Sequence, residues 1–233
     1  MRLGWARTRV DIRSGARVLD VGSGAFPNPR ADVCCDLLPD DDEHRNGVAA
    51  VIDRPFVIGD VTALPFRDGA FDFVIASHIA EHVEDPAAFC AEMSRVATAG
   101  YIETPSPLGD RLLHEDYHLW RVGHRDGALA FVAKGRRRPI ERWLTDAFYW
   151  VFNAGRGSGK PSMPLPGGRL GRVLRFPLVA SRGVLNRTGV LVTRVHFGPD
   201  APLRWRVHGE VAPVGRPSPS PLDRTPPTVS TTA

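Results

Sequence analysis

The stretch Val18-Leu19-Asp20-Val21-Gly22-Ser23-Gly24 decides the fold class of this chain. Its first four residues are apolar apart from one acid, which predicts a short buried strand, and the glycines that follow predict a tight turn. Glycines after a strand let the backbone approach a ligand closely, because no side chain stands in the way. The segment therefore predicts a strand whose carboxyl end borders a binding site.

Further short apolar segments follow along the chain. Beyond residue 110 we expect a hairpin around Asp126-Gly127, a helix that begins at Pro139 with an apolar stripe over 139–152 that includes Ile140 and Trp143, and a strand at 190–197. In the first half we expect strands at residues 31–36, 56–60, 71–76 and 100–104, and a helix that begins at Asp85-Pro86. Asp is a preferred helix N-cap, and Pro is favoured at the first helical position. Strands separated by helical or irregular crossovers indicate an α/β fold with a doubly wound, mainly parallel sheet, in which ligands bind at the carboxyl ends of the strands.

Three of these expected strands end in an acid: Asp20, Asp36 and Asp60. A carboxylate can accept hydrogen bonds from ribose hydroxyls or from an adenine amino group, but it repels phosphate. Pro27 and Pro29 interrupt the helix that would hold a diphosphate. Each acid alone could equally be a helix cap or a solvated loop residue. Together they favour a nucleoside ligand that carries positive charge.

Five segments resemble the class I S-adenosylmethionine-dependent methyltransferases of the small-molecule type: VLDVGSG (18–24), CDLLP (35–39), GDVTALPF (59–66), FDFVIASHIAEHVEDP (71–86) and YIETP (101–105). The resemblance implies a Rossmann-like fold, S-adenosyl-L-methionine as cofactor, and in-line methyl transfer to a small-molecule or sugar-type acceptor, which could be anionic. It also implies a set of cofactor-binding residues: Asp20, Gly22, Ser23, Gly24, Asp36, Asp60, Val61 and Ser77.

The chain departs from this family pattern in two places. Phe26 stands where a third glycine is usual, and the first crossover, residues 25–30, is too short for the usual first helix. These departures leave an alternative open, a catalytically inactive protein of the same fold that binds S-adenosylmethionine or has a regulatory role. A nucleic-acid methylase is a third hypothesis, which the two lysines and the lack of a recognisable nucleic-acid module make less favourable.

His78 and His82 follow the fourth expected strand and are the candidate catalytic residues, because a hydroxyl or ammonium acceptor must lose a proton and His is the usual base near neutral pH. A structural or surface role is nevertheless more common for any single His. The same segment, HIAEH, matches a zinc-peptidase pattern, which we disfavour because it directly follows a buried strand. A second group could border the acceptor: His114, Tyr117, His118 and Trp120.

Composition and charge bound the remaining possibilities. No run approaches the roughly 20 apolar residues that cross a bilayer, and the three cysteines form no disulfide framework, so we expect a cytoplasmic protein without a transmembrane segment. Residues 1–110 carry a net charge of −8 and residues 111–233 one of +12. We expect a cofactor-binding core over 1–110, a C-terminal α+β extension or lid over 111–210, and a disordered tail over 211–233. No nucleic-acid partner is expected, and the oligomeric state is left open.

Overall fold

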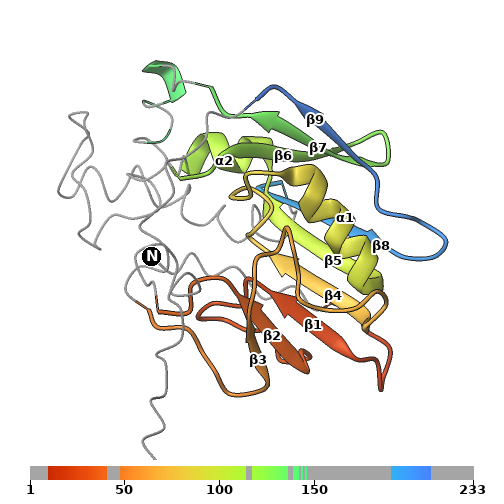
Figure 1. The fold of residues 1–233 in the computed structure, drawn as a ribbon. Coiled ribbons are helices and arrows are strands. Elements are labelled where there is room, and N and C mark those ends of the chain that lie inside the picture. Colours follow the sequence, from red (N-terminus) through yellow and green to blue (C-terminus); the bar gives the residue numbers. More distant parts are fainter. Residues whose placement is uncertain are drawn as a thin grey trace, which may run out of the picture.

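Strand β1 (Val18–Val21) lies inside a six-stranded sheet whose order is β3-β2-β1-β4-β5-β8 (Figure 1). The computed structural model describes residues 10–40, 48–113, 117–135, 139–141, 143, 145 and 190–210. The first five strands are parallel: β1, β2 (Val33–Asp36), β3 (Phe56–Ile58), β4 (Phe71–Ser77) and β5 (Ala97–Pro105). This confirms the expected α/β fold with a doubly wound, mainly parallel sheet.

The order of the strands fixes where a ligand can approach. The chain moves from β1 outward to β2 and β3, then returns to pair β4 on the other side of β1. The carboxyl ends of β1 and β4 therefore lie next to each other at the point where the strand order reverses, which is where open α/β sheets bind ligands. No helix forms between β1 and β2, as the short crossover predicted.

Strand β8 (Val192–Phe197) is antiparallel and pairs with β5, with Gly100 opposite Phe197. A Cβ at Gly100 would lie 2.5 Å from the Phe197 ring, so the ring packs directly on the glycine. The predicted strand near residues 190–197 is thus confirmed. It also shows that the segment expected to form a C-terminal extension contributes a strand to the first sheet.

Helix α1 (Pro86–Val96) begins where the sequence predicted. The Asp85 carboxylate accepts hydrogen bonds from the backbone N–H groups of Ala87 and Ala88 at 2.9 and 3.0 Å. The buried face of the helix packs on one side of the sheet and consists of Pro86, Phe89, Cys90, Met93 and Val96. Regular apolar spacing and a capped start therefore suffice to place α1.

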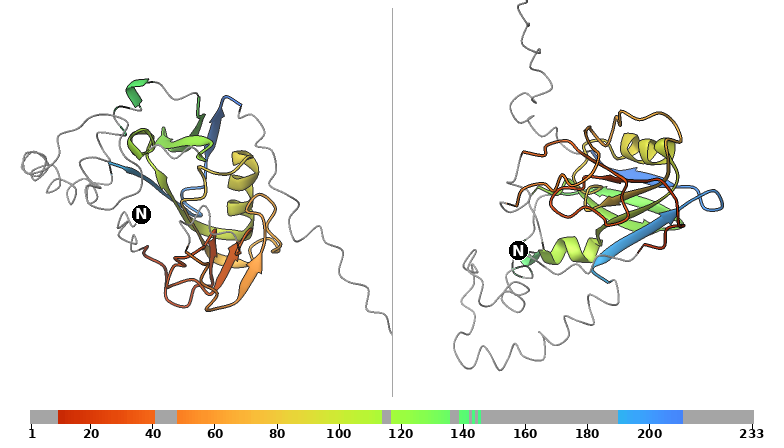
Figure 2. Two further views of the ribbon diagram at one scale, coloured as in Figure 1. Left: turned by 90° about the vertical axis from the view of Figure 1, so that its left-hand side faces the viewer. Right: turned by 90° about the horizontal axis from the view of Figure 1, so that it is seen from below.

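A second, three-stranded sheet lies beside α1 (Figures 1 and 2). It consists of β6 (Trp120–Arg125), β7 (Ala128–Ala133) and β9 (Trp205–His208). Asp126 and Gly127 both have positive φ, at 52° and 72°, so they form the tight turn that joins β6 to β7 as predicted. Buried residues of β6 and β7, among them Trp120 and Phe131, belong to the same core as α1 and β4.

Helix α2 (Pro107–Leu113) follows β5 directly and contacts β6. The Ser106 hydroxyl accepts a hydrogen bond from the backbone N–H of Gly109 at 3.0 Å near its first turn. Within the described part of the chain, neither α1 nor α2 has the length and apolar character that a membrane crossing requires.

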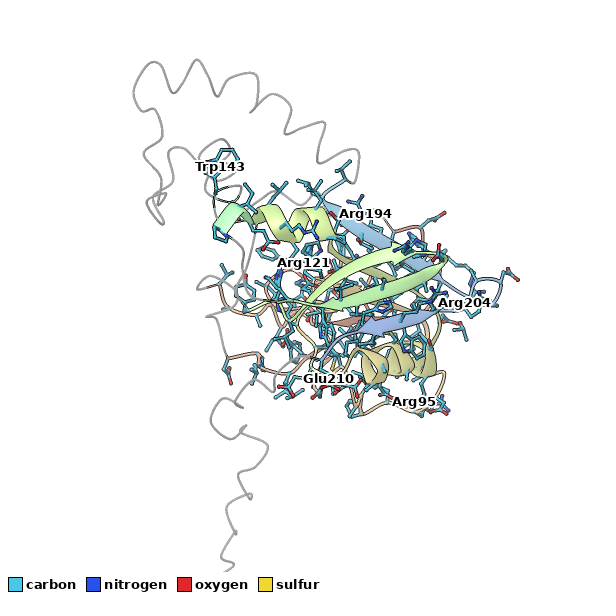
Figure 3. All side chains as sticks on the ribbon, turned by 90° about the horizontal axis from the view of Figure 1, so that it is seen from above. Arg95, Arg121, Trp143, Arg194, Arg204 and Glu210 are labelled. Atoms are coloured by element: carbon cyan, nitrogen blue, oxygen red, sulfur yellow. The ribbon has the colours of Figure 1, made fainter. Side chains whose placement is uncertain are left out.

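The apolar stripe predicted over residues 139–152 is wrong for the positions that the structure describes. Ile140 is 57% exposed and Trp143 is 47% exposed, and Figure 3 shows Trp143 away from the sheets, whereas Glu141 and Thr145 are buried. The reason is polar contact: Glu141 accepts from Arg121 at 3.2 Å. The rest of this stripe, His114 and the tail over 211–233 lie outside the described residues.

Candidate functional site

The loop after β1 is tied to the end of β2 by backbone geometry. Gly22 and Gly24 have φ of 63° and 47°, a region that glycine adopts without strain. The backbone N–H of Gly22 donates to the Cys35 carbonyl at 2.7 Å, and that of Gly24 donates to Asp36 Oδ2 at 2.9 Å. The glycine loop and the acid at the end of β2 therefore form one unit.

Asp36 is half-buried, and backbone donors hold both of its carboxylate oxygens. Oδ2 accepts from Gly24, and Oδ1 accepts from the backbone N–H of Leu38 at 3.2 Å. A carboxylate offers about four lone-pair sites, so each oxygen can accept one further hydrogen bond. The orientation and the remaining acceptor capacity match a pair of ribose hydroxyls.

Asp20 is almost fully buried, at 3% exposure, and its Oδ2 accepts from the backbone N–H of Asn28 at 2.7 Å. The carboxylate thereby holds the turn that replaces the usual first helix. Ser23 is buried in the same turn, whereas Phe26 is 55% exposed. The predicted contact of Asp20 with a cationic amino group remains a prediction.

Gly22 has a second reason to be glycine that the sequence does not reveal. A Cβ at this position would lie 2.0 Å from Cδ1 of Ile79, so the segment after β4 packs directly on the glycine loop. The loops after β1 and β4 are thus in contact, as the convergence of adjacent strand ends requires.

Asp60 and Val61 follow β3, and Ser77 ends β4. Asp60 is exposed, and its Oδ1 accepts from both the backbone N–H and the hydroxyl of Thr62, at 2.8 and 2.7 Å. Val61 is partly buried against the core, and Ser77 lies opposite Glu103 of β5. All the predicted cofactor residues therefore lie at or just beyond the carboxyl ends of β1 to β4.

His78, immediately after β4, has a φ of 59° and is held between two carboxylates. Its Nδ1 lies 3.3 Å from Glu81 Oε1, and its Nε2 lies 3.6 Å from Glu103 Oε1. Burial alone would lower the pKa of His78, but hydrogen bonds and charge from Glu103 and Glu81 raise it to about 9. The imidazole is then protonated near neutral pH, a state in which it cannot act as the base that the sequence suggested.

Glu81 is almost fully buried, at 1% exposure. Burial would raise the pKa of Glu81, but the hydrogen bond from His78 and the charges of the neighbouring histidines lower it to about 2. Its backbone carbonyl accepts from Leu119 and Trp120 at 2.8 and 3.2 Å, which joins this segment to the start of β6. Residues 78–84 form turns and bends, so the HIAEH segment does not make the single helix of a zinc peptidase.

His82 is brought against the second histidine group that the sequence singled out. Its ring stacks on Tyr117 with centroids 5.4 Å apart and meets His118 in a T-shaped contact at 4.8 Å. The pKa of His82 is lowered because burial and the charge of His118 outweigh the attraction of Glu81. Trp120 does not join this ring cluster in the same way. Its indole N–H donates to the Val83 carbonyl at 2.7 Å, which links the start of β6 to the turn after β4.

His118 connects this group to a buried charge network. Its Nδ1 lies 2.7 Å from Oδ1 of Asp110 in α2. Oδ1 of Asp110 also lies 3.5 Å from Nζ of Lys134, and its Oδ2 lies 3.3 Å from Nε of Arg121, which lies between α2 and the second sheet (Figure 3). Burial would raise the pKa of Asp110, but the hydrogen bond from His118 and the charges of Lys134, His118 and Arg121 lower it below its ordinary value.

Comparison with known proteins identifies the domain. Residues 19–102 match the family model of a methyltransferase domain. An uncharacterized methyltransferase of Mycobacterium sp. (strain KMS) is 36% identical over 148 residues, which cover 60% of this chain and 54% of that protein. Residues 19–102 are therefore a region of methyltransferase similarity, which supports the resemblance to the class I S-adenosylmethionine-dependent enzymes.

Other known proteins are also similar to part of the chain. The demethylmenaquinone methyltransferase of Renibacterium salmoninarum is 38% identical over 104 residues, covering 41% of this chain and 44% of that protein. A solved S-adenosylmethionine-dependent methyltransferase from Mesorhizobium loti is 18% identical, with a TM-score of 0.34, over 52% of this chain and 57% of that one. The chain spans about half the length of the curated relatives that it matches.

The glycine loop and Asp36 have the geometry that the nucleoside part of an S-adenosylmethionine ligand would need. Asp36 is pre-oriented by two backbone donors, and the loop at Gly22 and Gly24 presents backbone at the strand ends. Charged residues were missed farther from this loop: Glu103, Asp110, Lys134 and Arg194. For Glu103 a signal exists in the sequence, because an acid inside an apolar strand needs a partner, and the structure supplies Tyr101 and Arg194.

Proposed function

We propose that this chain is an S-adenosylmethionine-dependent methyltransferase that acts on a small-molecule or sugar-type acceptor. The observation that carries the proposal is the joint placement of the glycine loop and Asp36, with Gly24 donating to the carboxylate at 2.9 Å. The family match over residues 19–102 supports the same activity. The small-molecule class is supported by the relative named for demethylmenaquinone.

In this proposal the cofactor lies across the ends of β1 to β3. Asp36 accepts the ribose hydroxyls, Asp60 and Val61 border the adenine, and the methionine end lies near Asp20 with the loop and strand-end residues Gly22, Ser23, Gly24 and Ser77. The cofactor supplies a methyl group on a sulfonium. The chain's own residues bind and orient it, and alignment alone contributes several kcal/mol to a bimolecular transfer.

The acceptor is placed at the end of β4, where His78 and His82 border it. His78 is fixed as a cation between Glu81 and Glu103, so both of its ring nitrogens are engaged and it borders the acceptor without removing a proton from it. His82, 33% exposed at its side chain, is the one of the two that packs on Tyr117 and His118.

Calorimetric titration with S-adenosylhomocysteine tests the cofactor site. We expect Asp36→Ala to weaken binding at least tenfold, about the loss of a charge-assisted hydrogen-bond pair. Asp68→Ala is the matched control, because Asp68 is an exposed acid near the amino end of β4 that pairs only with Arg95 among the described residues. Equal affinity of the two variants, with unchanged circular dichroism, would contradict the proposal.

Transfer itself is tested by release of S-adenosylhomocysteine in the presence of a panel of quinol, amine and sugar acceptors. Turnover with at least one acceptor class, absent in Asp36→Ala at subsaturating cofactor, is the expected result. Tight cofactor binding without turnover on any acceptor would favour the alternative, a binding or regulatory protein of the same fold.

A further inference from the structure

Three potential metal ligands meet beside the cofactor site. Glu81, His82 and His118 each offer one donor atom, and these atoms lie within 4.8 Å of one another. Glu81 and His118 are buried, and His82 is partly buried. They come from the turn after β4 and the segment just before β6, and backbone hydrogen bonds from Leu119 and Trp120 to the Glu81 carbonyl hold these two segments together.

Glu81 has an oxygen that the protein leaves unsatisfied. Oε1 faces His78 at 3.3 Å, whereas Oε2 is buried and has no hydrogen-bond partner among the described residues. A buried carboxylate oxygen without a partner is costly, and such groups in native proteins call for an ion, a water or a ligand. The side chain is 2% exposed, so bulk water does not compensate for it.

Both histidines are oriented by outer partners, as metal-binding histidines usually are. His118 Nδ1 is engaged by Asp110 Oδ1 at 2.7 Å, which leaves Nε2 as its available donor. The ring of His82 is held by stacking on Tyr117, with the centroids 5.4 Å apart. Asp110 is itself fixed by Arg121 and Lys134, so the orientation of His118 has a second layer of support.

We propose that Glu81, His82 and His118 bind a divalent transition-metal ion of the zinc type. Two imidazole nitrogens and one carboxylate oxygen are a donor set that zinc and related metals accept, and three protein ligands leave one position open. Ligands at about 2.1 Å from tetrahedral zinc lie roughly 3.4 Å apart, so the side chains close by about an ångström on binding. The exposed sides of His82 and Tyr117 provide the entry path.

Metal binding at this site does not depend on the proposed methyl transfer, but a role for the metal in the reaction does. Glu81 and His82 directly follow His78 in the turn after β4, on the side where the acceptor is placed. The open position on the metal would then hold an acceptor oxygen, a consequence that does rest on the proposed methyl transfer. His82 would serve as a ligand in that case, and the metal would polarise the acceptor.

Titration of the full chain, stripped with a chelator and then dialysed, tests the site. We expect ZnCl2 to bind at a one-to-one ratio by calorimetry, and CoCl2 to give visible d–d absorption bands. His118→Asn and Glu81→Gln are expected to lower zinc affinity at least tenfold. The control is His124→Asn, an exposed His of β6 in the same hairpin, which should bind zinc as the wild type does.

Two results would overturn the proposal: no saturable zinc binding by the wild type, or equal affinity in all four proteins. His82→Asn provides a third variant at a partly exposed position, in case Glu81→Gln does not fold, and it should also lose at least tenfold in affinity. Titration with S-adenosylhomocysteine without metal separates this failure from a failure of the proposed function, because Asp36 has no part in the metal site.

Discussion

The ends of β1 to β3 and the turn after β4 are both polar, but they are built in different ways. At the first, each acid bonds a nearby backbone N–H: Asp20 that of Asn28, Asp36 that of Gly24 and Asp60 that of Thr62. At the second, His78 and His82 contact side chains far away in sequence, Glu103 and His118, which in turn bond Arg194 and Asp110. Local sequence therefore specifies the first region, whereas only the completed fold specifies the second.

The largest effect on stability should come from the side-chain network. Asp110→Asn removes the carboxylate charge that Arg121 and Lys134 face, and breaking a buried ion pair costs about 3 kcal/mol or more. The free energy of unfolding, measured in urea, should fall by about that amount. Asp126→Asn is the control, because Asp126 is exposed in the β6–β7 turn and should change stability by less than about 0.5 kcal/mol. Similar losses of unfolding free energy in Asp110→Asn and Asp126→Asn would contradict the claim that the buried network contributes more than an exposed ion pair.

The backbone-built region should respond to a single methyl group. Gly22→Ala introduces a side chain at a φ of 63° and within 2.0 Å of Ile79, so we expect the free energy of unfolding to fall by about 2 kcal/mol. Gly15→Ala has a similar φ, 77°, but no atom within 4 Å of the new Cβ, so it should lose only about 1 kcal/mol. Replacing Ile79 by Ala in the Gly22→Ala variant should recover only the part of the lost unfolding free energy that comes from the clash with Ile79, and not the part that comes from the positive φ.

A smaller effect, which depends on pH, is expected at the loop after β3. Glu92 accepts from the backbone N–H of Leu64 at 2.6 Å and pairs with Arg95, and these bonds lower the pKa of Glu92 below its ordinary value of 4.5. The folded state then binds protons less readily than the unfolded one, so this stabilisation is present above pH 4.5 and is lost as the pH falls.

Glu92→Gln should therefore destabilise the protein by about 1 kcal/mol at pH 7, and the difference from the wild type should shrink as the pH falls toward 3. Urea unfolding at several pH values measures it. A difference that stays constant with pH would mean that the side chain acts by packing and not by charge.

Much of the fold could be predicted because its signals are local. Short apolar runs gave the five parallel strands, Asp85-Pro86 gave the start of α1, and Asp126-Gly127 gave the turn between β6 and β7. The expected burial of Ile140 and Trp143 was wrong, because apolar periodicity identifies one face of a helix but does not say which residues of the fold that helix will pack against. Opposite it lies Arg121, which draws Glu141 inward.

The residues of the candidate site also fall into two groups, those that local sequence indicates and those that only the fold brings together. The acids at the strand ends could be recognised because each closes an apolar run. The contact of His82 with His118 joins residues 36 positions apart, and nothing in either neighbourhood indicates it. His78 was a reasonable candidate base from its position alone, but its protonation is set by Glu103, which arrives from the adjacent strand.

The antiparallel pairing of β8 with β5 has a consequence for how the protein can be divided. A fragment that ends at residue 110 would contain the whole family match, yet one row of β5 backbone donors and acceptors would lose its partner strand. Such open strands recruit other chains and aggregate. The segment that matches the methyltransferase domain is therefore shorter than the segment that pairs both edges of β5, and an expressed fragment should include residues 190–198.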